Sequence, residues 1–328
     1  MSAPTKQKTW KLRSLLALVM VAALFVIADP RKVLPLIGQA NPLLILAGTF
    51  SVFVMYFLRT IRWRVLLLIC AKPIPIFLLY VWTLAGTILN FLLPTSFGGD
   101  LGRWYLLQSQ SVSKAAAGFS LILDRLLGSL AFVPLLALTV IGGLSLPDSI
   151  QLGSKSILLA LITGALLLGL TAFLWRILTH DRGKEKLILV YNKFFKDSAD
   201  ADSLDITIEK IRGGRRSEWL NAILLSLCAH LCFVAAEYCF AVAIGVQVTF
   251  WQMSFLYLMA AMAMLVPISP NGLGIREGLN VWFLTALGNS TEAAFGYSLI
   301  SLAVRFVTCL PSMLYVDIRP KQGKPTED

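Results

Sequence analysis

The stretch "LLPTSFGGDLGRW" at residues 92–104 follows a long apolar run and combines a proline, three glycines, an aspartate and an arginine. A second stretch, "LVPISPNGLGIRE" at 265–277, also follows an apolar run. Aligned on Pro94 and Pro267, the two share the pattern P-x-S-x-x-G-x-x-x-R. The other matched pairs are Ser96 with Ser269, Gly99 with Gly272, and Arg103 with Arg276. Two copies at the same spacing indicate an internal repeat.

The composition around these stretches is strongly apolar. The chain has 328 residues, of which 57% are hydrophobic and 14% charged, and its mean hydropathy is +0.75. In a soluble domain, about a quarter of all residues would be charged. We therefore expect an all-α polytopic membrane protein that forms a single integral membrane domain. The net charge of +11 then reflects membrane topology and attraction to anionic lipids, and we expect no nucleic-acid partner.

Eight apolar segments follow one another along the chain, and most approach the roughly 20 residues that cross a bilayer. They are 14–28, 42–58, 74–93, 115–143, 156–178, 219–246, 251–267 and 293–317. The long polar stretch 179–218 separates a first half (14–178) from a second half (219–317), and we expect it to form a cytoplasmic loop with an amphipathic helix. The basic N-terminus resembles a signal peptide, but the proline in "VIADP" makes a poor cleavage site, which favours an uncleaved first helix.

The distribution of Lys and Arg predicts the topology. The N-terminus, the link 59–73, the stretch 179–218 and the C-terminal tail are basic, and the positive-inside rule places all four in the cytoplasm. If every apolar segment crossed once, the stretch 179–218 would end outside. The stretch 179–218 returns to the cytoplasm if 74–108 does not cross but enters and leaves the membrane on the cytoplasmic face. The C-terminal tail is then also cytoplasmic if 251–290 enters and leaves on the opposite face. In the alternative, all eight segments cross.

The topology with two non-crossing segments predicts six crossing helices and two re-entrant hairpins. The hairpins are related as an inverted repeat, an architecture typical of transporters. This topology places both termini in the cytoplasm and the loop 144–155 outside. We expect the protein in the plasma (bacterial inner) membrane.

Each hairpin turn predicts a ligand site. Irregular backbone at membrane depth is tolerated where it is buried in protein or lines a wet cavity. The helices expected to begin near Asp100 and near Gly272 would point free N–H groups and a positive dipole end into that space, which suits an anion. Arg103 and Arg276 follow about one turn later, where each would bind a phosphate. In the alternative interpretation, proline and glycine only kink the helices and the arginines reach to the interface.

Further ionisable residues lie inside apolar segments, where they mark a functional site or a structural pair. Asp124 and Arg125 are adjacent in "SLILDRLLG" at 120–128. Asp124 either lines a cavity or pairs with another helix, for example with Arg305. The predicted headgroup-binding residues are Ser96, Gly98, Gly99, Asp100, Arg103, Asp124, Arg125, Ser269, Gly272, Gly274, Arg276, Glu277 and Arg305, and the candidate cavity-lining residues are Asn90, His230 and Glu237.

Several motifs are missing from the chain. There is no Walker A motif, the stretch 179–218 is too short for a catalytic domain, and two histidines with scattered acids suggest no metal cluster. We therefore expect no catalytic residues, no metal and no cofactor.

The stretches "PTSFGGDLGRWYLL", "SLILDRLLG" and "PISPNGLGIREG" together resemble the lysylphosphatidylglycerol synthase transmembrane family, the membrane half of the multiple-peptide-resistance factor. The resemblance covers about 14–317 and implies a flippase for aminoacylated phospholipid. The soluble half that makes this lipid is missing here, so we expect no synthase activity, and the lipid itself stays undefined. The family match falls on Pro94, Gly98, Gly99, Asp100, Arg103, Asp124, Arg125, Gly128, Pro267, Gly272, Gly274, Arg276, Glu277 and Gly278.

Three functions follow as hypotheses. The leading one is a lipid flippase that moves an anionic, zwitterionic or aminoacylated lipid between leaflets, with membrane lipids as its partners. The second is a membrane-embedded transferase acting on a phospholipid or polyprenyl phosphate, with Asp100, Asp124 and Glu237 as its acids. The third is a non-transporting partner subunit of a separate lipid-modifying enzyme. The sequence does not define the oligomeric state.

Overall fold

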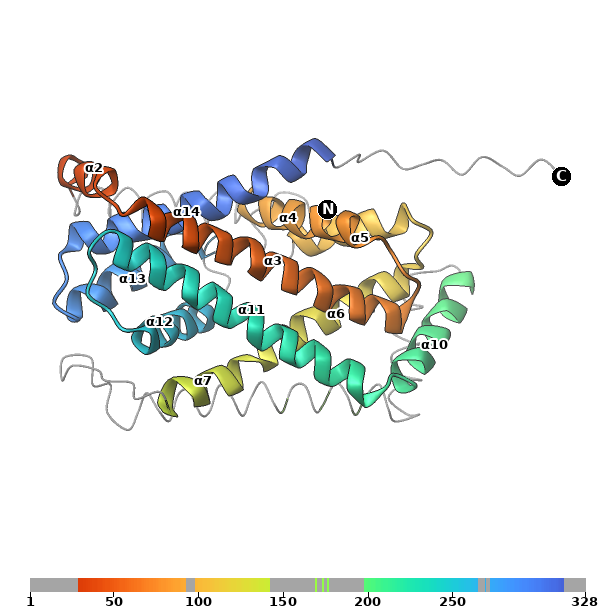
Figure 1. Ribbon diagram of the computed structural model, residues 1–328. Helices are drawn as coiled ribbons and strands as arrows, with labels where there is room; N and C mark the ends of the chain where they lie inside the picture. The colour runs from red at the N-terminus through yellow and green to blue at the C-terminus, as the bar shows by residue number, and fades with distance from the viewer. Residues whose placement is uncertain are drawn as a thin grey trace, which may run out of the picture.

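The computed structural model describes residues 29–92, 98–141, 198–264 and 272–315, together with Gly169, Phe173, Arg176 and Ser269. These residues form a bundle of helices and contain no strand (Figure 1). In chain order the helices are α2 (Pro30–Gly38), α3 (Pro42–Cys70), α4 (Ile76–Leu92), α5 (Gly98–Gln108), α6 (Lys114–Leu130), α7 (Phe132–Ile141), α10 (Ser198–Arg212), α11 (Arg216–Ala243), α12 (Phe250–Ala263), α13 (Ile275–Ala286), α14 (Thr291–Cys309) and the 3₁₀ helix η2 (Leu310–Tyr315). The expected all-α architecture is confirmed.

Four helical stretches in the described part of the chain are long and apolar enough to span a membrane: Pro42–Cys70, Lys114–Thr139, Arg216–Ala243 and Thr291–Tyr315. The chain is therefore a polytopic membrane protein, as the sequence predicts. The expected crossing segments 14–28 and 156–178, the loop 144–155 and both termini lie outside the described residues.

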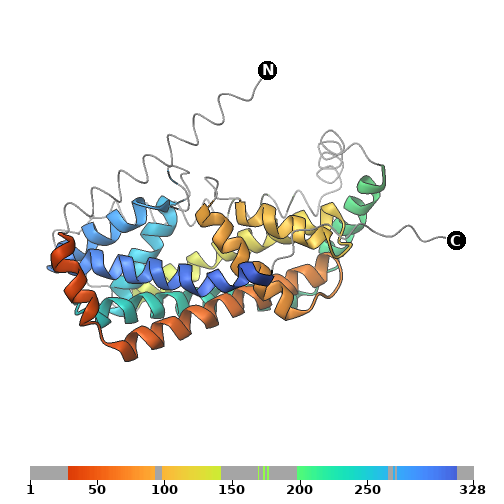
Figure 2. The same cartoon turned by 90° about the horizontal axis from the view of Figure 1, so that it is seen from above.

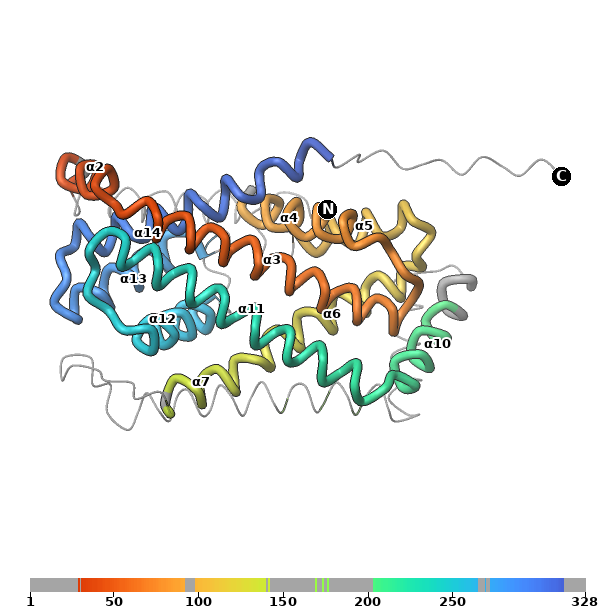
Figure 3. The backbone as a smooth tube through the Cα atoms, in the orientation of Figure 1, coloured from red at the N-terminus to blue at the C-terminus, as the bar shows by residue number. Residues whose placement is uncertain are grey.

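Helices α3 and α11 lie side by side and antiparallel, and they form the most extensive helix pair in the described bundle (Figures 1 and 3). Helix α3 starts at Pro42, where the Asn41 side chain accepts hydrogen bonds from the first free N–H groups. It continues to Cys70. The predicted end at residue 58 is therefore wrong, and Arg59 and Arg62 belong to the helix rather than to a connecting link.

Two helical hairpins enter the bundle from opposite ends (Figure 2). Helix α4 has only 17 residues, and the chain returns beside it as α5; α12 and α13 form the second hairpin. Ile76–Phe91 is shorter than the four candidate spans, which agrees with the expected re-entrant hairpin at 74–108, and the alternative in which 74–93 crosses the membrane stays a prediction. The order α3, α4–α5, α6–α7 recurs as α11, α12–α13, α14–η2, which is the predicted inverted repeat.

The first hairpin depends on two glycines that bring its backbones together. A Cβ on Gly99 would lie 2.0 Å from the carbonyl oxygen of Gly86. The Gly99 N–H donates to the Asn90 side chain at 2.7 Å, so the start of α5 is fixed to the end of α4. Small residues at such contacts let membrane helices approach closely.

Replacing Gly99 by alanine is expected to destabilise the protein by about 1–3 kcal/mol, because the added methyl forces α4 and α5 apart. Thermal unfolding in detergent measures the effect. Gly118→Ala is the matched control, because its nearest neighbour, Trp104 Nε1, lies at 3.9 Å. Equal unfolding temperatures for the two variants would contradict the tight contact.

Helix α10 lies within the polar stretch 179–218, where an amphipathic helix was expected. Its Leu204, Ile208 and Ile211 are buried, and the helix packs on α6 and α3. The stretch is thus shorter than predicted, because α11 already begins at Arg216. The predicted segment 115–143 is also divided, since Ala131 separates α6 from α7.

The fold places α2 and α10 at opposite ends of the bundle (Figure 1). On a cysteine-free background we expect Gln39→Cys, at the end of α2, to react with an impermeant thiol reagent from outside. Lys210→Cys, on α10, should react only after permeabilisation, because the positive-inside rule predicts that the basic segments face the cytoplasm. Labelling of both from one side would contradict the fold, and the reverse pattern would contradict the orientation.

Candidate functional site

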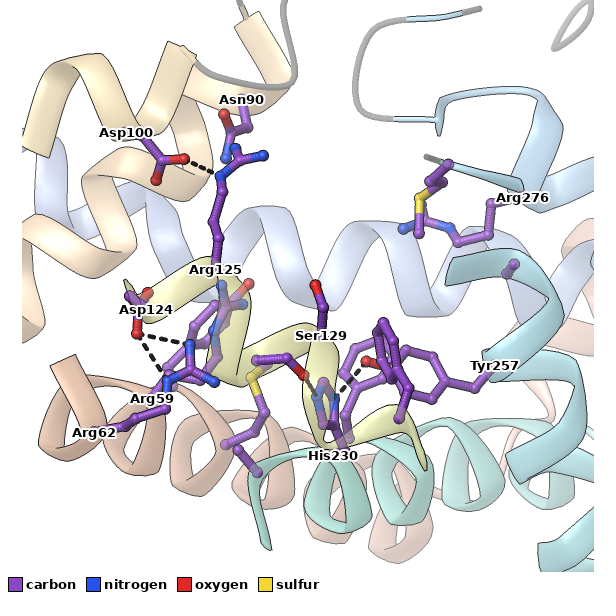
Figure 4. A pocket seen from close by; sticks show the side chains of 18 of the residues that line it. Arg59, Arg62, Asn90, Asp100, Asp124, Arg125, Ser129, His230, Tyr257 and Arg276 are labelled. Carbon is purple, nitrogen blue, oxygen red and sulfur yellow. Dashed lines mark hydrogen bonds and ion pairs between the residues drawn. The ribbon is translucent and has the colours of Figure 1, made fainter. Parts of the chain in front are cut away.

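A polar cavity of about 350 Å³ lies between the two hairpins and the helices α3, α6, α7 and α11 (Figure 4). Each hairpin contributes to its wall, and so do the arginines of both repeated motifs, Arg103 and Arg276. The sequence-predicted residues that line it are Asn90, Asp100, Arg103, Asp124, Arg125, His230 and Arg276. Residues that are almost 180 positions apart in the chain thus face one space.

Asp124 is the centre of a buried ion network on one side of the cavity. The Arg62 guanidinium donates to it through Nε at 2.7 Å and also donates to the Ser226 hydroxyl at 3.0 Å. Arg103 contacts the second carboxylate oxygen of Asp124 at 3.3 Å. Arg103 also lies over the Trp63 ring, 4.8 Å from its centroid. One carboxylate is therefore shared by two buried arginines.

Asp100 extends this network towards the first hairpin. Arg103 and Arg125 both donate to its carboxylate, one to each oxygen. Figure 4 shows Arg125 reaching from α6 towards Asp100 and Asn90. Asp100 lies in the first turn of α5, where the helix dipole also favours its negative charge. The network thus ties the hairpin to α3 and α6.

On the opposite side of the cavity, Arg276 is held by its neighbour in sequence. Its guanidinium donates to Glu277 at 2.7 Å, and the other Glu277 oxygen accepts from the Gly274 N–H at 2.6 Å. Glu277 is buried and does not line the cavity. It neutralises part of the charge of Arg276 and caps α13.

The predicted free N–H groups at the two helix starts are in part occupied. The Gly99 N–H binds Asn90 and the Gly274 N–H binds Glu277. Helix α5 begins at Gly98 and α13 at Ile275, each within three residues of the expected start. Because buried backbone donors in a membrane protein need partners within the protein, the two side chains cap these helices, and the arginines carry the positive charge that faces the cavity.

Glu237 and Arg305 lie in a separate cluster. Glu237 accepts hydrogen bonds from the hydroxyls of Tyr297 and Ser301, and Arg305 Nε lies 4.0 Å from its carboxylate. Neither Glu237 nor Arg305 lines the cavity. The suggested pairing of Asp124 with Arg305 is therefore wrong, because Asp124 is neutralised by Arg62 and Arg103.

His230 lies in the wall of the cavity next to an aromatic group. Its ring nitrogens are in hydrogen-bond contact with the Gly128 carbonyl at 2.9 Å and the Tyr257 hydroxyl at 2.7 Å (Figure 4). The Phe132 ring lies 4.7 Å from the His230 ring, centroid to centroid. The cavity therefore has a charged side near Asp124 and a less polar side near Tyr257.

The remaining predicted residues shape the hairpins or fall outside the description. Gly98 and Gly99 are buried at the start of α5, and Gly272 and Gly274 have positive φ angles in the turn before α13, which suits glycine. Ser269 is buried, and its hydroxyl has no hydrogen-bond partner among the described residues. Ser96 and the two motif prolines lie outside the described residues. In the part of the chain that is described, no group of three or more His, Cys, Asp or Glu is placed to hold a metal.

Comparison with known proteins connects this geometry to a family. The family model for the lysylphosphatidylglycerol synthase TM region matches residues 13–312. The chain belongs to this family. It is also 21% identical over 306 residues to a UPF0104 membrane protein of Methanothermobacter thermautotrophicus, with 89% of each chain covered. The resemblance inferred from three short motifs is thus confirmed over nearly the whole length.

Sequence reasoning missed several cavity residues of this family member. Arg59 and Arg62 both line the cavity, although the positive-inside rule assigned them to a cytoplasmic link. A helical projection of α3 could have found them, because Arg59 and Arg62 are three residues apart and lie on one face of a helix. Tyr257 and Phe233 had no comparable signal, since aromatic residues are common in membrane helices.

Proposed function

We propose that this membrane protein moves lipids between the two leaflets and binds the lipid headgroup in the cavity between the hairpins. The observation that supports this most directly is that Arg103 and Arg276, one from each copy of the repeated motif, line a single cavity. Membership of the lysylphosphatidylglycerol synthase TM region family agrees with a lipid as the substrate class.

The architecture supports alternating access to that cavity. Hairpins that enter from opposite ends and meet around a binding site occur in transporters, where one repeat moves against the other. Here each hairpin is bonded to its own surroundings, the first to Asp124 through Arg103 and the second through contacts of α13 with α12 and α14. Movement of one hairpin would open the cavity to one face while the other hairpin keeps it closed.

Transport of fluorescent phospholipids in reconstituted vesicles tests the proposal. The purified protein is placed in vesicles with labelled lipids of several headgroups, and a membrane-impermeant reductant quenches the label in the outer leaflet. We expect the protein to increase the fraction of label that becomes accessible. A rate equal to that of empty vesicles for every headgroup would overturn the proposal.

The transferase and partner-subunit hypotheses predict different results. A transferase of this kind would need acids for a metal or for proton transfer, but Asp100 and Asp124 are both bound to arginines. Dependence of any activity on a divalent metal would favour it. A partner subunit would keep its role in cells after both Arg103 and Arg276 are replaced by alanine.

A further inference from the structure

The charges around the cavity do not balance. Two aspartates line it, Asp100 and Asp124, against five arginines: Arg59, Arg62, Arg103, Arg125 and Arg276. Glu277 does not line the cavity, but it accepts a hydrogen bond from Arg276 and neutralises the charge of that arginine. A charge on His230 would only increase the positive excess.

Among the described residues, Arg59 is the arginine of the cavity wall that has no direct ion-pair partner. It faces the cavity from the middle of α3, and within the described residues it makes no hydrogen bond or ion pair. Arg62, one turn away, is held by Asp124. A guanidinium in a membrane-embedded cavity without a direct ion-pair partner is costly, so an anion that enters the cavity gains a contact that the empty site lacks.

The neighbouring apolar stretches offer no further acid in their sequence. The segments 14–28 and 156–178, which lie outside the described residues, contain no Asp or Glu, and neither do residues 93–97 and 265–268. Glu237, the remaining acid near mid-bundle, faces Arg305 and the hydroxyls of Tyr297 and Ser301.

We infer that the cavity selects a lipid headgroup with net negative charge, and that Arg59 is the residue that determines this selectivity. The inference rests on the proposed lipid transport and narrows its substrate class: a phosphodiester without a positively charged amine fits the site, whereas a zwitterionic or aminoacylated headgroup brings its ammonium group among the arginines. Like charges at such distances repel strongly in a low-dielectric site.

Lipids that have the same acyl chains and different headgroups test this selectivity. Labelled phosphatidylglycerol, phosphatidylethanolamine and lysyl-phosphatidylglycerol carry net charges of −1, 0 and +1, and each is measured in the same vesicles. We expect phosphatidylglycerol to move about tenfold faster than phosphatidylethanolamine, the ratio that one charge-assisted contact provides, and lysyl-phosphatidylglycerol to move slowest. Transport of either amine-bearing lipid as fast as phosphatidylglycerol would overturn the inference and leave the proposed function standing.

Arg59→Gln is expected to lower the ratio of phosphatidylglycerol to phosphatidylethanolamine transport about tenfold, and Arg59→Lys to preserve most of it. Arg64→Gln is the matched control: Arg64 lies on the same helix, also makes no ion pair, and does not line the cavity. Equal changes of the ratio in Arg59→Gln and Arg64→Gln would exclude a specific role of Arg59.

A binding measurement separates failure of this inference from failure of the proposed function. The shift in unfolding temperature of the detergent-solubilised wild-type protein is recorded with each lipid added. If no lipid is transported but phosphatidylglycerol alone stabilises the protein, the function is wrong and the selectivity stands. If the three lipids stabilise it equally, the selectivity is wrong.

Discussion

Asp124→Ala is expected to remove about 3–5 kcal/mol of folding stability, because the loss of one partner leaves buried charges uncompensated. Among the described residues, Arg62 would lose its one carboxylate partner and Arg103 one of two. Both arginine side chains are less than 10% exposed, so water replaces the lost carboxylate only in part. Thermal unfolding in detergent and the yield of monodisperse protein measure the effect.

A double variant and a control test the cause. Arg62→Met combined with Asp124→Leu removes both members of the pair and should recover much of the stability, since apolar replacement of a buried ion pair is often near neutral. Glu209→Ala breaks the Arg212–Glu209 pair, whose glutamate side chain is 54% exposed, and should cost no more than about 1 kcal/mol. An Asp124→Ala protein that unfolds within about 2 °C of the wild type would show that the network contributes little.

The second large effect concerns the two motif arginines. Arg103→Gln and Arg276→Gln are each expected to lower lipid transport about ten- to a hundredfold, because a charge-assisted contact is worth roughly 1.5–3 kcal/mol. Glutamine removes the charge and keeps one amide donor, but it is shorter than arginine and cannot reach Asp100 and Asp124 together. Initial rates in the vesicle assay give the result, and Lys72→Gln, at an exposed position after α3, is the control.

Because both arginines line one cavity, the double variant should lose less than the sum of the single losses. Strict additivity would assign the two side chains to separate environments. Since Arg103 also holds Asp100 and Asp124, the amount of folded protein is measured for every variant by gel filtration. A loss of folded protein that matches the loss of transport would assign a structural role to the arginine.

The inverted repeat and the hairpins could be predicted from the sequence because they leave local signals. Proline and glycine end the short helices, and the basic segments fix the parity of the crossings. The two copies of the motif then place Arg103 and Arg276 in corresponding positions. These inferences need only the spacing of residues along the chain and no knowledge of side-chain packing.

The partners of the buried charges could not be predicted in this way. Asp124 contacts Arg62, which is 62 positions away and belongs to a different helix, and nothing in the spacing distinguishes Arg62 from Arg305 as its partner. The rule that assigns arginines to cytoplasmic ends also missed Arg59 and Arg62, because a polar cavity and a buried ion network can accommodate arginines well inside a helix. The capping of Gly99 and Gly274 likewise depends on side-chain positions that only the folded chain defines.

The short hairpins also have an electrical consequence. A cavity lined by mobile dipoles and fixed charges is more polarisable than lipid, so the membrane potential is expected to fall mainly across the one hairpin that separates the cavity from the closed side. Each charge that crosses this thin layer exchanges about 2.3 kcal/mol with a potential of 100 mV. In a cell whose interior is negative, this field would push an anionic headgroup outward, so for the proposed lipid transport the membrane voltage would set a direction without an ATPase motif in the chain.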